Sequence, residues 1–316
     1  MCNETWQSRA EEYIDDSRRL GYALTTTSAY LLSFARFVDQ RGHSGALTSD
    51  IILDWAQSTD SKKPTTWTKR LINIRRFISH CSRVDGKSEV PRVDVFGRPK
   101  GRPTPHIYTE LEISELLAAA RELPGTLPSA TYETLFGLLA STGLRLSEAL
   151  HLRCSDVDLR SGRLIVRQGK LGKSRLVPLH ATVCEVLSRY LGVRQQLPLT
   201  SESYFFVSQT GGLLPRRTVE GVFIRLRTKL GWAPRGNWRA PRIHDLRHTF
   251  ICRRVTQWHK EGADIDNAML YVSTYVGHVA VTYTYWYLTG IPELMTVVGQ
   301  RFEAFAESAR GAENAE

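Results

Sequence analysis

A break in helical periodicity between about Asp85 and His106 divides this chain and limits what it can fold into. Proline fixes the backbone and removes a donor, whereas glycine carries a high entropic cost in regular structure. Both accumulate in this segment beside basic residues, namely Pro91, Gly97, Pro99, Gly101, Pro103 and Pro105 with Arg92, Arg98, Lys100 and Arg102. The chain has 316 residues, enough for about two domains, so a basic extended linker between two domains is expected.

Apolar residues recur at helical spacing from Thr25 to about Ser82. Thr48 and Pro64 stand where the second and third of these segments are expected to begin. The stripes comprise Leu31, Phe34 and Val38, then Ile51, Ile52 and Trp55, then Trp67, Leu71, Ile74, Phe77 and Ile78. A small helical bundle is therefore predicted before the linker.

The region after the linker mixes helical stripes with a short sheet. A capping signal at Thr109 predicts a helix start, and Gly143 is expected to end a later helix. Residues 163–168 and 174–179 are strand-like segments on either side of a glycine-containing turn, which predicts a β-hairpin. A further strand is predicted over Tyr204–Val207. The predicted fold class is mainly α with a small β-sheet.

Composition points to an acidic polymer as partner. The formal net charge is +10, the excess expected of a nucleic-acid-binding protein, although a solvated helix face explains each basic cluster equally well. The cysteines are dispersed without metal-ligand spacing, at Cys2, Cys81, Cys154, Cys184 and Cys252. Neither a signal peptide nor a membrane span is apparent. We expect reduced thiols, no metal, no membrane partner and a soluble intracellular protein.

Several short motifs follow one another in an order that suits phosphodiester chemistry. They are Thr142-Gly143-Leu144-Arg145, the Lys170-containing hairpin turn, His244-Asp245-Leu246-Arg247-His248, Gly277-His278 and the cluster Tyr283-Thr284-Tyr285-Trp286-Tyr287. Covalent transfer of a phosphodiester needs a nucleophile, cations on the non-bridging oxygens and a proton for the leaving alkoxide. Each motif alone is more often structural than catalytic, and their conjunction is the signal.

The residues divide these tasks among themselves. Arg145 and Arg247 can each hold phosphate oxygens bidentately, and His244 shares a helix face with Arg247. Lys170, with Lys173 as its rival in the same turn, can protonate the departing 5′ oxygen. A phenol would attack, so neither ATP nor another cofactor is needed.

A zinc site is the competing interpretation of part of this pattern. His244, His248 and Cys252 lie at helical spacing on one face, but no fourth ligand is evident.

These motifs, written out as TGLRLSEAL, QGKLGKSRLVPLH, HDLRHTF and VGH followed by a tyrosine, resemble the tyrosine recombinases, or phage integrase family. The resemblance spans roughly Thr25 to Phe305 and implies a pocket of Arg145, Lys170, His244, Arg247 and His278 with Tyr287 as nucleophile. It also implies Glu148 as a supporting acid. Because Tyr283 and Tyr285 lie close by, Tyr287 is assigned by register. The ending TYTYWYLTGIPELM is more similar to integrases of transposon-like elements than to other members.

The resemblance implies a helical, SAM-like core DNA-binding domain over 1–88, a linker over 89–107, an α/β catalytic domain over 108–290 and a tail over 291–316. The sequence departs from some family members in its N-terminus, which is expected to be too short for an extra arm-binding domain. The tail stripe Ile291, Leu294, Val298, Phe302 and Phe305 either packs on its own domain or docks on a neighbouring protomer. Duplex DNA is the implied partner, with a dimer on each site, a tetramer in the synapse and related recombinases as further partners. The residues expected to contact DNA are Lys69, Arg70, Arg75, Arg76, Arg98, Lys100, Arg102, Lys173, Arg216 and Arg217.

The function that the resemblance implies is site-specific DNA strand exchange through a 3′-phosphotyrosine, as in integration, excision, inversion or transposition of a mobile element. A cytoplasmic, nucleoid-associated location in a prokaryotic host would follow. Two alternatives use the same fold: an accessory DNA-binding subunit that needs a related partner, and a relaxase like the type IB topoisomerases. The intact pocket argues against the first, and the absence of a long linker insertion against the second.

Overall fold

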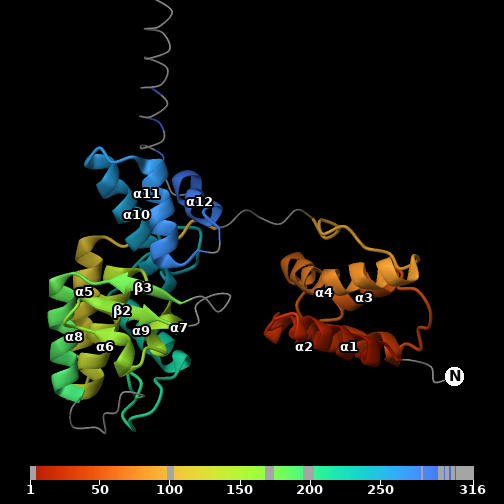
Figure 1. The fold of residues 1–316 in the computed structure, drawn as a ribbon, viewed down its shortest axis with the longest axis horizontal. Coiled ribbons are helices and arrows are strands. Elements are labelled where there is room, and N and C mark those ends of the chain that lie inside the picture. The colour runs from red at the N-terminus through yellow and green to blue at the C-terminus, as the bar shows by residue number, and fades with distance from the viewer. Residues whose placement is uncertain are drawn as a thin grey trace, which may run out of the picture. The chain divides into compact units, whose positions relative to one another are not determined.

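The computed structural model describes residues 5–97, 103–167, 174–194, 203–278 and 280–290, together with single positions 295, 299 and 303. The chain separates into two compact units, Met1–Gly101 and Arg102–Glu316 (Figure 1). In the described residues no helix is both long and apolar enough to cross a membrane.

The first unit contains helices α1 (Trp6–Arg19), α2 (Thr25–Gln40), α3 (Ser49–Gln57) and α4 (Pro64–Asp85). The predicted stripes of α2 and α3 are buried, as are the α4 stripe residues apart from the half-buried Trp67. Thr48 is the N-cap of α3, and Pro64 opens α4, as expected. Apolar side chains spaced at helical intervals thus form one core for this unit.

Helix α1 was not predicted, because its sequence is rich in charge and its apolar stripe is sparse. Trp6, Ala10 and Ile14 form that stripe and are buried at four-residue intervals. The backbone N–H groups of Trp6 and Gln7 donate to the carboxylate of Asp39 at 2.8 and 2.9 Å. A carboxylate from α2 therefore satisfies donors at the start of α1 that lack a partner within the helix.

The second unit is built from α5 (Glu110–Arg121), α6 (Thr126–Thr142), α7 (Leu146–Leu150), α8 (Ala181–Arg194), α9 (Arg216–Lys229), α10 (His244–Lys260), α11 (Ile265–Val276) and α12 (Thr282–Gly290). The predicted capping signal is confirmed: Thr109 Oγ1 accepts from Glu112 N at 3.1 Å, and Glu112 Oε2 accepts from Thr109 N at 2.7 Å. Helix α6 packs against α5, α8 and α10. Figure 1 shows α10, α11 and α12 together at one end of this unit.

A small antiparallel sheet lies beside these helices in the order β1 (Val157–Asp158), β2 (Arg163–Val166) and β3 (Arg175–Pro178), after a 3₁₀ turn at Cys154–Asp156. Strands β2 and β3 form the predicted hairpin, with Leu164 opposite Val177, both of them buried. The predicted turn at 169–173 lies outside the described residues.

The predicted strand over Tyr204–Val207 is wrong. Tyr204 and Val207 make only isolated bridges, to Arg153 and Leu213, in the described part of the chain. Phe205 and Phe206 are both fully buried, so the segment does not alternate between a core face and a solvent face. The apolar run therefore serves as a buried loop, in which Phe205 N donates to Leu152 O at 2.7 Å.

Candidate active site

Two helices end in glycines that adopt left-handed backbone conformations. Gly143 ends α6 with φ of 62°, and Gly277 ends α11 with φ of 67°. A Cβ at Gly143 would lie 2.5 Å from the ring of Phe250, and one at Gly277 would lie 2.8 Å from Arg175 Nη1. Conformation and space together require glycine at both positions, and each glycine exposes carbonyl oxygens of the last helical turn.

Two arginines bind these helix-end carbonyls. Arg247 Nη1 donates to Gly143 O and its Nη2 donates to Val276 O, both at 2.7 Å. Arg145 Nη2 donates to Gly277 O at 2.8 Å. Carbonyls at a helix C-terminus lack partners within the helix and favour cations, so the ends of α6 and α11 hold both guanidinium groups in place.

A single carboxylate connects Arg145 to the hairpin. Glu148 Oε1 accepts from Arg145 Nη1 at 2.6 Å, and both Glu148 oxygens accept from Arg175 on β3, at 3.0 and 2.9 Å. Burial by itself would raise the pKa of Glu148, but the bonds and charges of Arg175 and Arg145 lower that pKa to about 2. The carboxylate therefore remains charged and fixes the orientation of Arg145.

Arg247 is buried, with an exposed fraction of only 3%. Burial, followed by the charge of Arg145, lowers the pKa of Arg247 to about 10. The guanidinium is still charged near neutral pH, and its two terminal nitrogens donate to neutral carbonyls. The positive charge of Arg247 is therefore available to bind an anion.

His244 is the first residue of α10, where helix N–H groups favour an anion. Desolvation within the cavity, and then the charges of nearby arginines, lower the pKa of His244 to about 4. The residue as a whole is exposed, so desolvation contributes less to this lowered pKa than full burial would. A bound phosphate would offset the arginine charges and so reverse their part of the lowering. At neutral pH the ring is uncharged and can serve as a hydrogen-bond donor.

Tyr287 lies on α12 and is 2% exposed. Its hydroxyl is 2.8 Å from His248 Nδ1. The His278 ring lies nearly parallel to the Tyr287 ring, with centroids 6.3 Å apart, and His278 Nδ1 is 2.7 Å from Thr284 Oγ1. Histidines thus contact both the face and the hydroxyl of this phenol.

The two neighbouring tyrosines are placed differently. Tyr285 donates its hydroxyl to Asp266 Oδ1 at 3.3 Å, on the α11 side. Tyr283 is 45% exposed and borders the same cavity as Tyr287.

These groups meet around a cavity of about 490 Å³. Five of the six predicted catalytic residues line it, and Glu148 contacts one of them. The sixth, Lys170, and its rival Lys173 lie outside the described residues. The cavity is lined by Pro103, Arg145, Trp238, Arg242, His244, Arg247, His248, His278, Tyr283, Trp286 and Tyr287.

Sequence reasoning missed several of these contacts. His248 was considered only as a zinc ligand, and Arg175 was treated as part of the hairpin. Arg242, whose guanidinium stacks on Trp238 and pairs with Asp245 at 2.6 Å, was not considered. The arginine in SRLVPLH and the second histidine in HDLRH were the available signals.

The predicted DNA-contacting residues fall into different environments. Lys69, Arg76 and Arg217 are exposed, and Arg216 is exposed while pairing with Glu220 at 2.7 Å. Arg70 and Arg75 are half-buried and donate to the carbonyls of Trp55 and Pro91. Three more, Arg98, Lys100 and Arg102, lie outside the described residues, as does the whole tail stripe.

Within the described ranges, no group of three or more histidine, cysteine or acidic residues could hold a metal. Among the three residues considered as zinc ligands, His248 has another contact, since its Nδ1 lies 2.8 Å from the Tyr287 hydroxyl.

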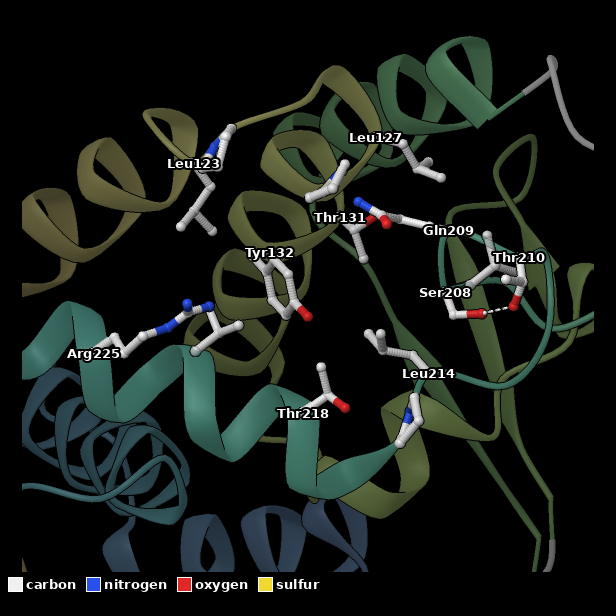
Figure 2. A pocket seen from close by; sticks show the side chains of 15 residues that line it. Leu123, Leu127, Thr131, Tyr132, Ser208, Gln209, Thr210, Leu214, Thr218 and Arg225 are labelled. Atoms are coloured by element: carbon white, nitrogen blue, oxygen red, sulfur yellow. Dashed lines mark hydrogen bonds between the residues drawn. The ribbon is translucent and has the colours of Figure 1, made fainter.

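A second cavity, of about 480 Å³, lies elsewhere in the same unit (Figure 2). It is bordered by the first half of α6, the flank of α9 and the loop 207–210. Leu123, Leu127, Leu214 and Val222 give it a largely apolar lining, and it contains none of the predicted catalytic residues. Its polar groups are scattered, with Ser208 Oγ and Thr210 Oγ1 paired to each other at 3.0 Å.

Comparison with known proteins places these features in a family. Residues 107–290 match the model of the phage integrase family. The integrase/recombinase y4rB of Sinorhizobium fredii is 37% identical over 95% of this chain and 97% of its own length.

Solved structures share the fold at lower identity. The Tn1549 transposon integrase in complex with transposon right end DNA matches with a TM-score of 0.67 and 17% identity, over 93% of this chain and 98% of that one. A lambda integrase tetramer bound to a Holliday junction matches with a TM-score of 0.60 and 19% identity, over 88% and 77%.

Proposed function

The chain belongs to the phage integrase family, and we propose that Tyr287 is the nucleophile with which it cleaves and rejoins duplex DNA. It is a tyrosine recombinase, a DNA strand-exchange enzyme that acts in site-specific recombination. The single observation that supports Tyr287 is its place in the lining of a cavity shared with two arginines anchored on helix-end carbonyls.

The residues of this cavity suit an in-line transfer. The Tyr287 oxygen forms a bond to phosphorus while the bond from phosphorus to the 5′ oxygen breaks, which leaves a 3′-phosphotyrosine. Arg145 and Arg247 hold the non-bridging oxygens as charge accumulates on them, and His244 donates a further hydrogen bond. Lys170 is proposed to supply the proton that the 5′ oxygen takes up.

Glu148 acts through Arg145 in this proposal. Arg145 donates from Nη1 to Glu148 Oε1 and from Nη2 to Gly277 O. The orientation of its guanidinium group is therefore fixed before DNA binds. Such prior orientation avoids reorganisation during the reaction.

Duplex DNA is the proposed substrate, and the first unit is proposed as its second contact. The net charge of +10 favours a polyanion, and Lys69 and Arg76 are exposed on α4. Assignment of 1–88 to DNA binding, 89–107 to a linker, 108–290 to catalysis and 291–316 to a tail remains our proposal.

Assembly as a dimer on each site and a tetramer in the synapse is proposed as well, because lambda integrase forms a tetramer on a Holliday junction. A transposon-borne element as the source of the DNA sites agrees with the likeness to the Tn1549 integrase. An enzyme of this kind acts where the chromosome is, so we propose a cytoplasmic, nucleoid-associated location. The accessory-subunit and relaxase alternatives are not favoured by the family membership.

The test is covalent capture on nicked duplex DNA that carries the ends of the element in which this gene resides, with EDTA present. Wild-type protein and Tyr285→Phe should form a protein–DNA adduct, whereas Tyr287→Phe should bind the DNA without forming one. An adduct with Tyr287→Phe and none with Tyr285→Phe would show that the register is wrong.

A further inference from the structure

The proposed nucleophile is already in contact with a group that can take its proton. We propose that His248 is a further catalytic residue, which accepts the phenolic proton of Tyr287 through Nδ1 as cleavage begins; this rests on the proposed function of Tyr287. A phenol is a weak nucleophile until its proton is removed, and a base within hydrogen-bond reach is one way to activate it.

The geometry is that of a base and its acid. His248 Nδ1 and the Tyr287 hydroxyl are 2.8 Å apart, within the range of an O–H···N bond, and the two rings are tilted by 48° at a centroid distance of 5.4 Å. Both residues are buried, with 9% of His248 and 2% of Tyr287 exposed, yet both border the cavity. The proton would therefore move across a short contact that is shielded from bulk water.

Sequence position explains this contact. His248 follows His244 by one helical turn on α10, so both rings lie on the cavity face of that helix, with centroids 4.9 Å apart. His244 stands at the helix start, where the phosphate is expected, and His248 stands one turn deeper, beside α12. One helix thus carries a phosphate contact and a proton acceptor at four-residue spacing.

Other titratable groups of the cavity have different partners. His278 presents its ring face to Tyr287 and its Nδ1 to Thr284, while Glu148 is bound by Arg145 and Arg175. The charged or titratable groups that line the cavity together with His248 are His244 and Arg247 on α10, Arg242 before it, Arg145 before α7, His278 after α11, and Tyr283 and Tyr287 on α12. Glu148 contacts Arg145 in this lining.

The proton balance closes over a full cycle. In cleavage the Tyr287 oxygen bonds to phosphorus, its proton passes to His248 Nδ1, the bond to the 5′ oxygen breaks and that oxygen is protonated by the general acid. In rejoining, the 5′ hydroxyl attacks phosphorus, the tyrosine oxygen leaves, and His248 Nδ1 returns the proton. His248 must begin as the neutral ring with its proton on Nε2.

The experiment measures single-turnover adduct formation on the nicked DNA across pH 5.5 to 9.5 for wild type, His248→Asn and His151→Asn. Asparagine can keep an acceptor near Nδ1 but cannot take a proton. We expect His248→Asn to cleave on the order of 10²-fold more slowly near neutral pH, with a rate that rises tenfold per pH unit as hydroxide replaces the base. His151, exposed at the end of α7, is the matched control and should behave as wild type.

A second variant separates proton transfer from support of the fold. Imidazole in the buffer should restore adduct formation to His248→Ala but not to Tyr287→Phe. The proposal is overturned if His248→Asn cleaves within threefold of wild type with an unchanged pH profile, or if imidazole fails to restore a His248→Ala protein that still binds DNA. Failure of the proposed function would look different, because wild-type protein would then form no adduct.

Discussion

Among the cavities of the second unit, the one of about 490 Å³ around Tyr287 and the one of about 480 Å³ beside α9 (Figure 2) are nearly equal in volume, yet of these two only the first is suited to phosphate chemistry. The cavity beside α9 lies near helix N-termini, since Leu127 and Pro128 stand in the first turn of α6 and Pro215 is the N-cap of α9, and its lining is largely apolar. The cavity around Tyr287 lies where α6 and α11 end and α10 begins.

The difference teaches that arginines held by helix C-terminal carbonyls, more than volume, determine what chemistry a cavity supports. At Gly143 and Gly277 the chain offers carbonyls that hold Arg145 and Arg247 without neutralising them. A carboxylate in place of these carbonyls would cancel the charge of the arginine it holds, and the carboxylate that does contact Arg145, Glu148, is shared with Arg175, so a net positive charge remains. Helix-end carbonyls therefore leave the positive charge available to a phosphate.

Removal of either anchored arginine should have the largest effect. We expect Arg145→Ala or Arg247→Ala to slow adduct formation by 10²-fold or more, because charge on the non-bridging oxygens is no longer stabilised. The matched control is Arg225→Ala, which changes an arginine of the cavity beside α9 and should leave the rate within about twofold.

A neutral substrate sharpens this result. DNA with a methylphosphonate at the scissile position lacks the charge that the arginines balance, so the Arg145→Ala variant should recover most of its loss on it. Equal losses on both substrates would refute the charge-clamp assignment.

Substitution of a helix-end glycine should have an intermediate effect. Gly277→Ala places a Cβ 2.8 Å from Arg175 and adds strain at φ of 67°, so we expect cleavage to fall on the order of tenfold. Gly211→Ala is the matched control, since its φ is 80° but nothing lies within 4 Å. Both variants should melt at lower temperature, and only Gly277→Ala should lose cleavage. Equal cleavage by the two would contradict the role given to Gly277.

Acid should weaken the fold through Glu148. The folded pKa is about 2 and the usual value is 4.5, so the carboxylate stabilises the native state fully above pH 4.5 and loses that contribution as pH falls toward 2. The contribution is on the order of 3 kcal/mol. Urea unfolding between pH 7 and pH 2 should show a shallower loss for Glu148→Gln than for wild type.

The control for that measurement is Glu122→Gln, which removes an exposed surface pair with Lys229. Its acid profile should follow that of wild type. If Glu148→Gln followed it as well, the carboxylate would not be linked to folding as described.

The smallest effect is expected in the cavity beside α9. Thr218→Val exchanges an exposed hydroxyl for a methyl group of similar volume in that lining, so the rate of adduct formation should change by less than about twofold. A loss of tenfold or more with an intact fold would show that this cavity takes part in the reaction.

Much of the architecture was predictable because it depends on local periodicity. The buried stripes of α2 to α4, the hairpin of β2 and β3 and the left-handed end at Gly143 follow from residues close together in sequence. Helix α1 escaped prediction because only Trp6, Ala10 and Ile14 carry its stripe among many charges. The strand predicted over Tyr204–Val207 failed because burial on both sides of a segment does not identify a strand.

The site was only partly predictable, because the contacts that hold the predicted catalytic residues in place join residues far apart in the sequence. Motif order suggested Arg145, His244, Arg247, His278 and Tyr287, all of which line the cavity. By contrast, the contacts of Arg175 with Glu148 and of His248 with Tyr287 join residues on different elements. Their side chains carry no local pattern that distinguishes them from hairpin or helix residues.

The most direct test of the account identifies the amino acid that carries the DNA. Wild-type protein trapped on the nicked substrate would be digested with protease and nuclease, and the peptide that retains a nucleotide would be sequenced by mass spectrometry. We expect the nucleotide on Tyr287. A nucleotide on Tyr283, which borders the same cavity, or on Tyr285 would contradict it.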